Sequence, residues 1–127
     1  MILADTDVLI DYLLGVQPMA GQVRLYAEAS RLSTSAVSCF ELLSGAGQNR
    51  RGDDVRRLIA GIAVLPLDIE SATRAAAVQR SLKAKGLSIG MGDCLIAGIA
   101  LANGLQLLTR NRRHFQYVEG LETFSIN

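Results

Sequence analysis

The sequence predicts an α/β fold in which helices cover both faces of a mainly parallel sheet of four or five strands. Short apolar segments with strand character alternate with longer segments of helical periodicity, which is the order of right-handed βαβ units. Half of the residues are hydrophobic but only 5% are aromatic, so we expect an aliphatic core of the kind found where helices pack on a parallel sheet. The length of 127 residues suits one domain spanning 1–127.

The elements expected in the first half follow from apolar spacing and from residues that end helices. Residues 1–4 form a short apolar strand, and the next apolar residues recur at the spacing of a helix that Gly15 ends. In order, the expected elements are a strand at 1–4, helices at 6–14 and 19–30, a strand at 31–34, and helices at 36–45 and 55–62. We expect the polar segment 45–54 to be the most mobile loop.

The second half is expected to complete the sheet. Pro66 places the strand at 63–67 at an edge, because proline cannot donate a hydrogen bond to a central ladder. Asp68 is a typical helix N-cap, and Gly86 ends the long helix that follows. The next segment is apolar nearly all round, which predicts a helix buried on most sides. The last expected elements are this helix at 91–103, a strand at 105–109 and a peripheral strand at 122–126.

Charge and cysteine content exclude several classes of protein. The formal net charge is +1, so any contact with nucleic acid has to rely on local clusters of positive charge. Arginine outnumbers lysine by eleven to two, which favours recognition of phosphate or carboxylate groups. Cys39 and Cys94 match no zinc or disulfide spacing. With no secretory leader and no apolar run of membrane-spanning length, we expect a cytoplasmic protein without a membrane segment.

Three isolated acids stand where a functional site is expected. Asp5 directly follows the first strand, and Glu41 and Asp93 lie in apolar segments that begin helices. The carboxyl ends of parallel strands and the N-termini of the returning helices share one edge of an α/β sheet, so we expect these side chains to meet there. The residues that end the strand at 105–109 reach the same edge: Thr109, Arg110 and Asn111.

Three carboxylates in one pocket predict a divalent metal ion. Two carboxylates about 5 Å apart repel each other by roughly 3 kcal/mol at an effective dielectric constant near 20. A cation is therefore needed to keep all three ionised. Oxygen ligands without a neighbouring histidine or thiolate select Mg²⁺ or Mn²⁺.

Simpler explanations remain open for some of these acids. Glu41 follows Ser38 by three residues, which is the spacing of a capping box. Asp7 and Asp93 can each favour a helix dipole from the first turn of a helix. Asp5 has no comparable explanation, because an acid directly after a buried strand has no periodic role, and we therefore favour a functional role for it.

Four segments of the chain, taken in order, match a known family. They are ILADTDVLIDYL at 2–13, SAVSCFELLSG at 35–45, DCLIA at 93–97 and LLTRNRRHF at 107–115. Together they resemble the PIN-domain ribonucleases, and within that family the VapC-type toxins of bacterial type II toxin-antitoxin modules. The resemblance covers nearly the whole chain.

The resemblance implies a three-layer α/β/α sandwich with an acidic pocket that holds one or two Mg²⁺ or Mn²⁺ ions. By position, Asp5, Glu41 and Asp93 match the metal-binding acids of the family. Asn111 takes the fourth acidic place, which is often aspartate. Its amide removes one negative charge, so the number of metal ions stays open. Supporting residues beside the pocket in this comparison are Thr6, Asp7 and Thr109.

The activity that the resemblance implies is metal-dependent hydrolysis of RNA phosphodiester bonds by an endoribonuclease. In this chemistry the metal ion activates a water molecule and neutralises charge on the scissile phosphate. Basic residues near the last matching segment are candidate contacts to the RNA backbone, which position the substrate without specifying its sequence. They are Arg110, Arg112, Arg113 and His114.

Two protein partners are also implied. Proteins of this type form homodimers and are silenced by a small VapB-like antitoxin whose C-terminal segment fills the groove. Apolar helix residues can serve such an interface or the core, and the core is the default for Leu42, Leu43, Leu58 and Ile59. The RNA target is not indicated, because it depends on RNA shape and loop geometry.

Two other classes of protein remain as alternatives. A phosphatase of the haloacid dehalogenase type has a similar pair of acids, matched here by Asp5 and Asp7. Its later aspartate follows a buried strand, however, whereas Asp93 follows the polar segment 83–90. A non-catalytic binding module would keep the acidic pocket as a scaffold for protein interaction, and Asn111 keeps this alternative open.

Overall fold

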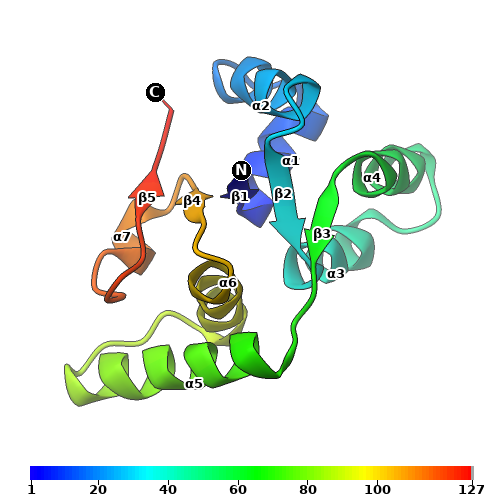
Figure 1. Cartoon of the computed structure of the whole chain (residues 1–127). Helices are drawn as coiled ribbons and strands as arrows, with labels where there is room; N and C mark the ends of the chain where they lie inside the picture. The colour runs from blue at the N-terminus through cyan, green and yellow to red at the C-terminus, as the bar shows by residue number, and fades with distance from the viewer. Residues whose placement is uncertain (127) are drawn as a thin grey trace.

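The computed structural model describes residues 1–126 and contains a five-stranded sheet in which every neighbouring pair of strands is parallel. The strand order is β3-β2-β1-β4-β5, with β1 in the centre (Figure 1). The strands are β1 (Ile2–Ala4), β2 (Leu32–Ser35), β3 (Ala63–Leu65), β4 (Gln106–Leu108) and β5 (Thr123–Phe124). The predicted parallel sheet is confirmed, and the strand before Pro66 lies at its edge, as expected.

Helices cover both faces of this sheet, and the alternation of side chains along β1 shows which helices lie on which face. The helices are α1 (Thr6–Leu14), α2 (Met19–Glu28), α3 (Ala36–Ala46), α4 (Arg50–Gly61), α5 (Ile69–Ala84), α6 (Met91–Ala102) and α7 (Arg112–Phe115). Ile2 and Ala4 pack in a buried cluster with residues of α1 to α4, whereas Leu3 packs in a second cluster with residues of α5 and α6. Figure 1 shows α5 and α6 on the opposite side of the sheet from α1 and α2. The α/β/α sandwich is therefore confirmed.

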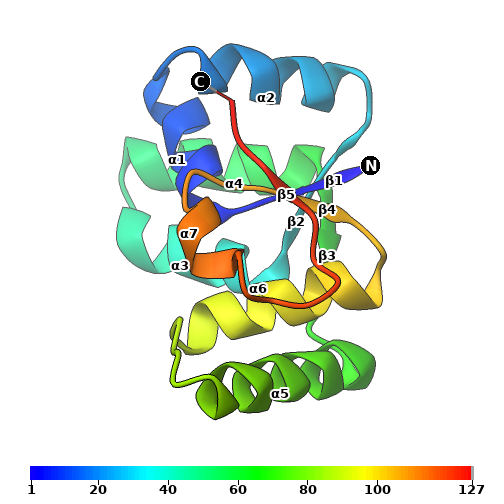
Figure 2. The same cartoon turned by 90° about the vertical axis from the view of Figure 1, so that its left-hand side faces the viewer.

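The carboxyl ends of the three central strands meet at one edge of the sheet. Because β1 is in register with both β2 and β4, three residues lie at the same level at this edge: Asp5 after β1, Ser35 as the last residue of β2, and Thr109 after β4. The chain crosses from β1 to β2 on one side, and β4 lies on the other side. This edge is therefore a topological switch point, the usual place for a ligand crevice in such a sheet. In Figure 2, α7 lies beside the start of α1 at this end of the sheet.

Side chains cap most of the helices that leave the strands. The caps of α1, α3, α4 and α5 each accept a hydrogen bond from a backbone N–H of the first turn, and they are Asp5, Ser35, Asn49 and Asp68. Gly15 ends α1 in the left-handed conformation, with φ of 71°. The predicted roles of Gly15 and Asp68 are therefore confirmed.

Some boundaries differ from the predicted ones. α4 begins at Arg50 and not at residue 55, because the Asn49 side chain accepts a hydrogen bond from Gly52 N and starts the helix earlier. Most of the segment expected to be a mobile loop is therefore helical. Residues 112–115, where no element was expected, form the short helix α7, and β5 has two residues where a strand was expected over 122–126.

Four apolar helix residues were expected to serve either the core or an interface, and the structure divides them between the core and the surface. Leu42 is buried, whereas Leu43 is exposed. Leu58 and Ile59 are partly buried against the cluster beneath α1 to α4. Within residues 1–126, we find no helix that is both long enough and apolar enough to cross a membrane.

The helices α5 and α6 approach each other closely at Gly98. A Cβ atom placed on Gly98 would clash with the backbone oxygen of Ser71 and would lie 2.7 Å from the Cβ of Ala75. Only glycine fits there without movement of the backbone. This contact fixes the position of α6, whose first turn carries Asp93.

Candidate active site

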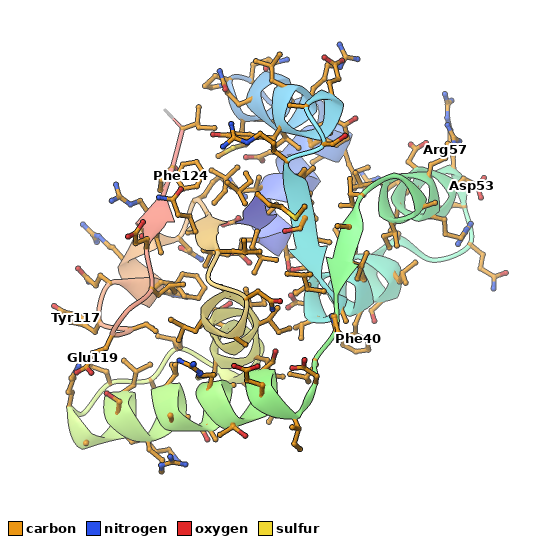
Figure 3. The ribbon with its side chains drawn as sticks, in the orientation of Figure 1. Phe40, Asp53, Arg57, Tyr117, Glu119 and Phe124 are labelled. Atoms are coloured by element: carbon orange, nitrogen blue, oxygen red, sulfur yellow. The ribbon has the colours of Figure 1, made fainter. Side chains whose placement is uncertain are left out.

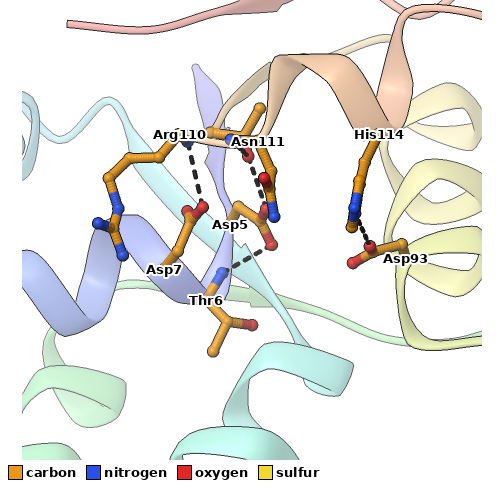
Figure 4. A network of polar contacts seen from close by, with 8 residues as sticks. Asp5, Thr6, Asp7, Asp93, Arg110, Asn111 and His114 are labelled. Carbon is orange, nitrogen blue, oxygen red and sulfur yellow. Dashed lines mark hydrogen bonds and ion pairs between the residues drawn. The ribbon is translucent and has the colours of Figure 1, made fainter. Parts of the chain in front are cut away.

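Asp5 joins the ends of two neighbouring strands. Its side chain is only 5% exposed. Its Oδ1 atom accepts a hydrogen bond from Thr6 N at 2.8 Å, and its Oδ2 atom accepts one from the hydroxyl of Thr109 at 2.7 Å. The same hydroxyl accepts a hydrogen bond from Asn111 N at 2.9 Å (Figure 4). Asp5 is thus both the N-cap of α1 and a tie to the loop that follows β4.

The electrostatic surroundings of Asp5 disfavour its charged form. Burial raises the pKa of this carboxyl to about 6, and the negative charges of Asp7 and Asp93 add to the increase. The hydrogen bonds from Thr109 and Thr6 oppose it but do not cancel it. A buried carboxylate with two acidic neighbours is a typical binding group for a cation.

Glu41 reaches Thr6, the neighbour of Asp5, from α3. The hydroxyl of Thr6 donates a hydrogen bond to Glu41 Oε1 at 2.7 Å and lies 2.8 Å from the buried hydroxyl of Ser38. The capping-box explanation for Glu41 is wrong, because the N-cap of α3 is Ser35, whose hydroxyl accepts a hydrogen bond from Ser38 N. Glu41 also lies near the start of α6, since a Cβ on Gly92 would be 3.5 Å from its Oε2 atom.

Asp93 lies in the first turn of α6 and faces α7. Its Oδ2 atom is 2.9 Å from His114 Nδ1, and its side chain is 27% exposed (Figure 4). Its charge nevertheless contributes to the raised pKa of Asp5, so the two acids share one electrostatic environment. The first-turn position that a simpler explanation gave to Asp93 is correct, and so is that of Asp7.

Two further acids of α1 contact Arg110. Asp7 Oδ2 accepts a hydrogen bond from Arg110 N at 3.2 Å, and Asp11 Oδ2 lies 3.1 Å from Arg110 Nε. Burial raises the pKa of Asp7, and the charge of Arg110 opposes this increase. Within residues 1–126, the buried Oδ1 atom of Asp7 has no hydrogen-bond partner.

The structure therefore brings together most of the residues singled out from the sequence. Those linked directly by hydrogen bonds are Asp5, Thr6, Asp7, Glu41, Thr109, Arg110 and Asn111. Asp93 and His114 form a separate pair beside them. Arg112 and Arg113 are exposed on α7 and form no ion pair with the described residues.

Sequence reasoning did not single out two residues of this network as functional, Ser38 and Asp11. Ser38 precedes Glu41 by almost one helical turn, and Asp11 follows Asp7 by four residues, so each shares a helix face with a residue that was singled out. That spacing is the signal by which both were detectable.

The side chains of the pocket suit a divalent cation in their chemistry. Apart from His114, Arg110 and the amide nitrogen of Asn111, the polar side-chain atoms are carboxylate, amide and hydroxyl oxygens, which Mg²⁺ and Mn²⁺ prefer. The raised pKa of Asp5 and the unpartnered oxygen of Asp7 both indicate negative charge without a full set of partners. The arrangement is open, however: among residues 1–126, no three His, Cys, Asp or Glu side chains lie close enough together to hold a metal ion.

Comparison with known proteins identifies the family. The family model described as PIN domain matches residues 2–121. The chain is 38% identical to Ribonuclease VapC10 of Mycobacterium tuberculosis over 96% of this chain and 91% of that protein. It is 30% identical to the tRNA(fMet)-specific endonuclease VapC of Shigella flexneri over 94% of this chain and 92% of that protein.

Solved structures agree with this assignment. VapBC-1 from nontypeable Haemophilus influenzae superposes with a TM-score of 0.81 and 28% identity, covering 98% of each chain. VapBC2 from Rickettsia felis, bound to a DNA fragment from its promoter, gives a TM-score of 0.85 over the whole of both chains, and at 20% identity it supports the fold alone. The chain therefore belongs to the PIN-domain family, in its VapC group.

Proposed function

We propose that this protein is a metal-dependent endoribonuclease that hydrolyses RNA phosphodiester bonds and acts as the toxin of a toxin-antitoxin system. The observation that carries the proposal is the buried Asp5 at the end of β1, whose pKa is raised to about 6. A bound cation would stabilise the charged form of this carboxylate, which has Asp7 and Asp93 nearby. The family relationship supports the ribonuclease activity. It leaves the phosphatase alternative without support.

We infer that Asp5, Glu41 and Asp93 hold Mg²⁺, with Mn²⁺ as a possible substitute. When bound, the ion supplies Lewis acidity to a water molecule and compensates the charge of the phosphate. The protein contributes orientation: Thr109 holds the Asp5 carboxylate, and Thr6 holds that of Glu41. Asp93, whose Oδ2 atom lies 2.9 Å from His114 Nδ1, would complete this set of carboxylates. Asn111 contributes an uncharged amide, which favours one ion over two.

The proposed RNA contacts are local, as the net charge of +1 requires. Arg110, Arg112, Arg113 and His114 follow β4 at the rim of the acidic pocket and are exposed. The positive charges of the three arginines suit the phosphates on either side of a scissile bond. A cellular RNA substrate also implies the cytoplasmic location that we expect.

An antitoxin partner has a suitable place beside the pocket. A hollow of about 530 Å³ lies between α1, α2 and α4, and another of about 330 Å³ lies between α1, α3 and α4. They share Leu13 and Asp54, and Glu41 lines the second one. We propose that an apolar segment of a VapB-like antitoxin occupies this groove and so blocks access to Glu41. The solved VapBC-1 structure from Haemophilus influenzae supports a partner of this kind.

We also propose that the protein forms a homodimer through the exposed side of α3. Phe40 is 68% exposed and projects from α3 beside the connection between β3 and α5 (Figure 3). That connection carries Leu67, which is 42% exposed, and the first residue of α5, Ile69, is 84% exposed. Large apolar side chains clustered at a surface are typical of a protein interface.

The experiment that tests the proposal is cleavage of a mixed cellular RNA pool by the purified protein in Mg²⁺, in Mn²⁺ and in EDTA. The variants Asp5→Asn and Asp93→Asn are compared with Asp53→Asn, which changes an exposed acid of α4. We expect discrete, metal-dependent cuts that disappear in the first two variants and persist in the control. Cleavage that survives Asp5→Asn would overturn the site, and no cleavage in any metal would favour the non-catalytic binding module.

A further inference from the structure

We propose that Asp11 is a positioning residue that holds the guanidinium of Arg110 at the rim of the pocket, so that its free edge binds a phosphate of the RNA backbone. The inference rests on the proposed ribonuclease function and adds to it a residue that does not line the pocket. In this proposal Asp11 holds Arg110 in the position for a phosphate contact before RNA binds.

The first observation is the burial of Asp11. Its side chain is 8% exposed, yet it is ionisable and lies in the last turn of α1, where a negative charge is not favoured by the helix dipole. A buried carboxylate is costly unless it is paired. Its pairing partner is Arg110 Nε, 3.1 Å from Asp11 Oδ2. The requirement of Asp11 for a positive partner thus fixes where the side chain of Arg110 lies.

The second observation is that this arginine is held differently from the other paired arginines. Arg56, Arg57 and Arg74 pair with exposed acids three or four residues away on their own helix. Arg110 pairs across elements, from the loop after β4 to α1. Its backbone is tied as well, because Arg110 N donates a hydrogen bond to Asp7 Oδ2 at 3.2 Å (Figure 4).

The third observation is that one edge of the guanidinium stays available. Asp11 contacts Nε, and within residues 1–126 the two Nη groups form no hydrogen bond. The side chain is 53% exposed. A guanidinium presents a planar fork of donors that matches two phosphate oxygens. Holding Nε from behind leaves the two Nη groups as that fork, and it removes part of the rotamer entropy that a free arginine loses on binding.

Arg110 adjoins residues of the proposed active site in the sequence. Arg110 follows Thr109, whose hydroxyl holds Asp5, and precedes Asn111. A phosphate bound by Arg110 therefore lies next to the group that the acids act on. The competing explanation is that Arg110 only neutralises Asp7 and Asp11. Both explanations predict a loss of stability when the pair is broken, but only positioning predicts a coupled loss of RNA binding.

The test measures binding of a single-stranded RNA across a range of KCl concentrations, in an Asp93→Asn background that does not cleave. To this parent we add Asp11→Asn, Arg110→Gln, both changes together, or the control Arg80→Gln, an exposed arginine of α5. We expect Arg110→Gln to weaken binding roughly tenfold. Its plot of log Kd against log salt should have a slope lower by about 0.7, the value for one phosphate contact on a single strand.

The effect of Asp11→Asn decides the inference. If Asp11 acts through Arg110, the single change weakens binding by several-fold and lowers the salt slope, and the double variant binds no more weakly than Arg110→Gln alone. Unchanged binding in Asp11→Asn, or losses that multiply in the double variant, would overturn the inference while leaving the ribonuclease proposal intact. A parent that does not bind RNA would instead overturn the proposed function and the inference with it.

The variant Arg110→Lys provides a second test of the inference if Asp11→Asn does not fold. Arg110→Lys keeps the charge but lacks the fork that the two Nη groups provide. We expect several-fold weaker binding with an unchanged salt slope. Equal affinity of the arginine and lysine proteins would show that charge alone suffices, and this would overturn the positioning role of Asp11.

Discussion

Asp5 stabilises the fold through one property and destabilises it through another. Its side chain caps α1 and accepts the Thr109 hydrogen bond. Its negative charge, however, is buried beside other acids, which raises its pKa from 3.8 to about 6. Between these two values the folded protein binds a proton that the unfolded chain has already released. The free energy of unfolding therefore falls as the pH rises from about 4 to 6, and it stays lower above pH 6.

This sign gives a prediction for Asp5→Asn in the absence of metal. Asparagine is as good an N-cap as aspartate but carries no charge. The shift corresponds to at most about 3 kcal/mol, so we expect the variant to be more stable than the parent by roughly 2 kcal/mol at pH 7.5. At pH 3.5 the difference should vanish. Urea unfolding in EDTA at both pH values measures this, and a variant that is less stable at pH 7.5 would contradict it.

The hydroxyl of Thr6 gives a second prediction, on activity. Thr6→Val keeps the shape of the side chain but removes the hydrogen bond to Glu41 Oε1. A group that orients a metal-binding carboxylate is typically worth tenfold or more, so we expect kcat for RNA cleavage to fall at least about tenfold. The matched control is Thr73→Val, which removes a hydroxyl bonded to Ile69 O within α5. Similar rates for both variants would show that Glu41 does not depend on Thr6.

The sequence drew attention to the acids more readily than to the groups that contact them. Asp5 was detectable because an acid directly after a buried strand is unusual, whichever element follows it. The links from Thr6 to Ser38 and from Asp11 to Arg110 depend on how α1 lies against α3 and the loop after β4. The orientation of α1 against these segments is set by tertiary packing, which the apolar periodicity of a single helix does not reveal.

The elements themselves were predictable where local chemistry decides them. Gly15 and Asp68 mark helix ends through backbone conformation and capping, and both predictions hold. The start of α4 was missed because the surrounding segment is polar and lacks an apolar stripe. The Asn49 cap starts the helix there without one. Apolar periodicity detects the buried part of a helix and misses a solvated first turn.

The packing of α5 on α6 gives a third prediction, on stability. In Gly98→Ala the new methyl group meets the Ser71 carbonyl and lies 2.7 Å from Ala75, so we expect a loss of about 1–3 kcal/mol. The matched control is Gly61→Ala at the end of α4, where a Cβ meets nothing within 4 Å. Alanine has the better helix propensity, so a gain of up to about 1 kcal/mol is expected there. Chemical denaturation measures both, and equal effects would contradict the close contact.

The acidic pocket depends on the whole fold, because its parts lie far apart in the sequence. The hydrogen bond between Thr109 and Asp5 spans 104 residues, and Glu41 and Asp93 come from two other segments. The proposed metal site requires that β1 and β4 are paired and that both α3 and α6 are in place. A metal ion that binds this pocket therefore binds the folded chain and not the unfolded one, and its binding free energy adds to the stability of the entire domain.

The last prediction follows from this linkage and from the pKa of Asp5. At a Mg²⁺ concentration one hundred times Kd, the free energy of unfolding rises by about 2.7 kcal/mol. Because the pKa of Asp5 is about 6, protons compete for this group at pH 5 and weaken binding about tenfold, which lowers the gain to roughly 1.4 kcal/mol. Thermal unfolding with and without Mg²⁺ should thus show a larger rise in Tm at pH 8 than at pH 5. Asp5→Asn should show little rise at either pH, and an equal rise at both pH values in the parent would place the ion elsewhere.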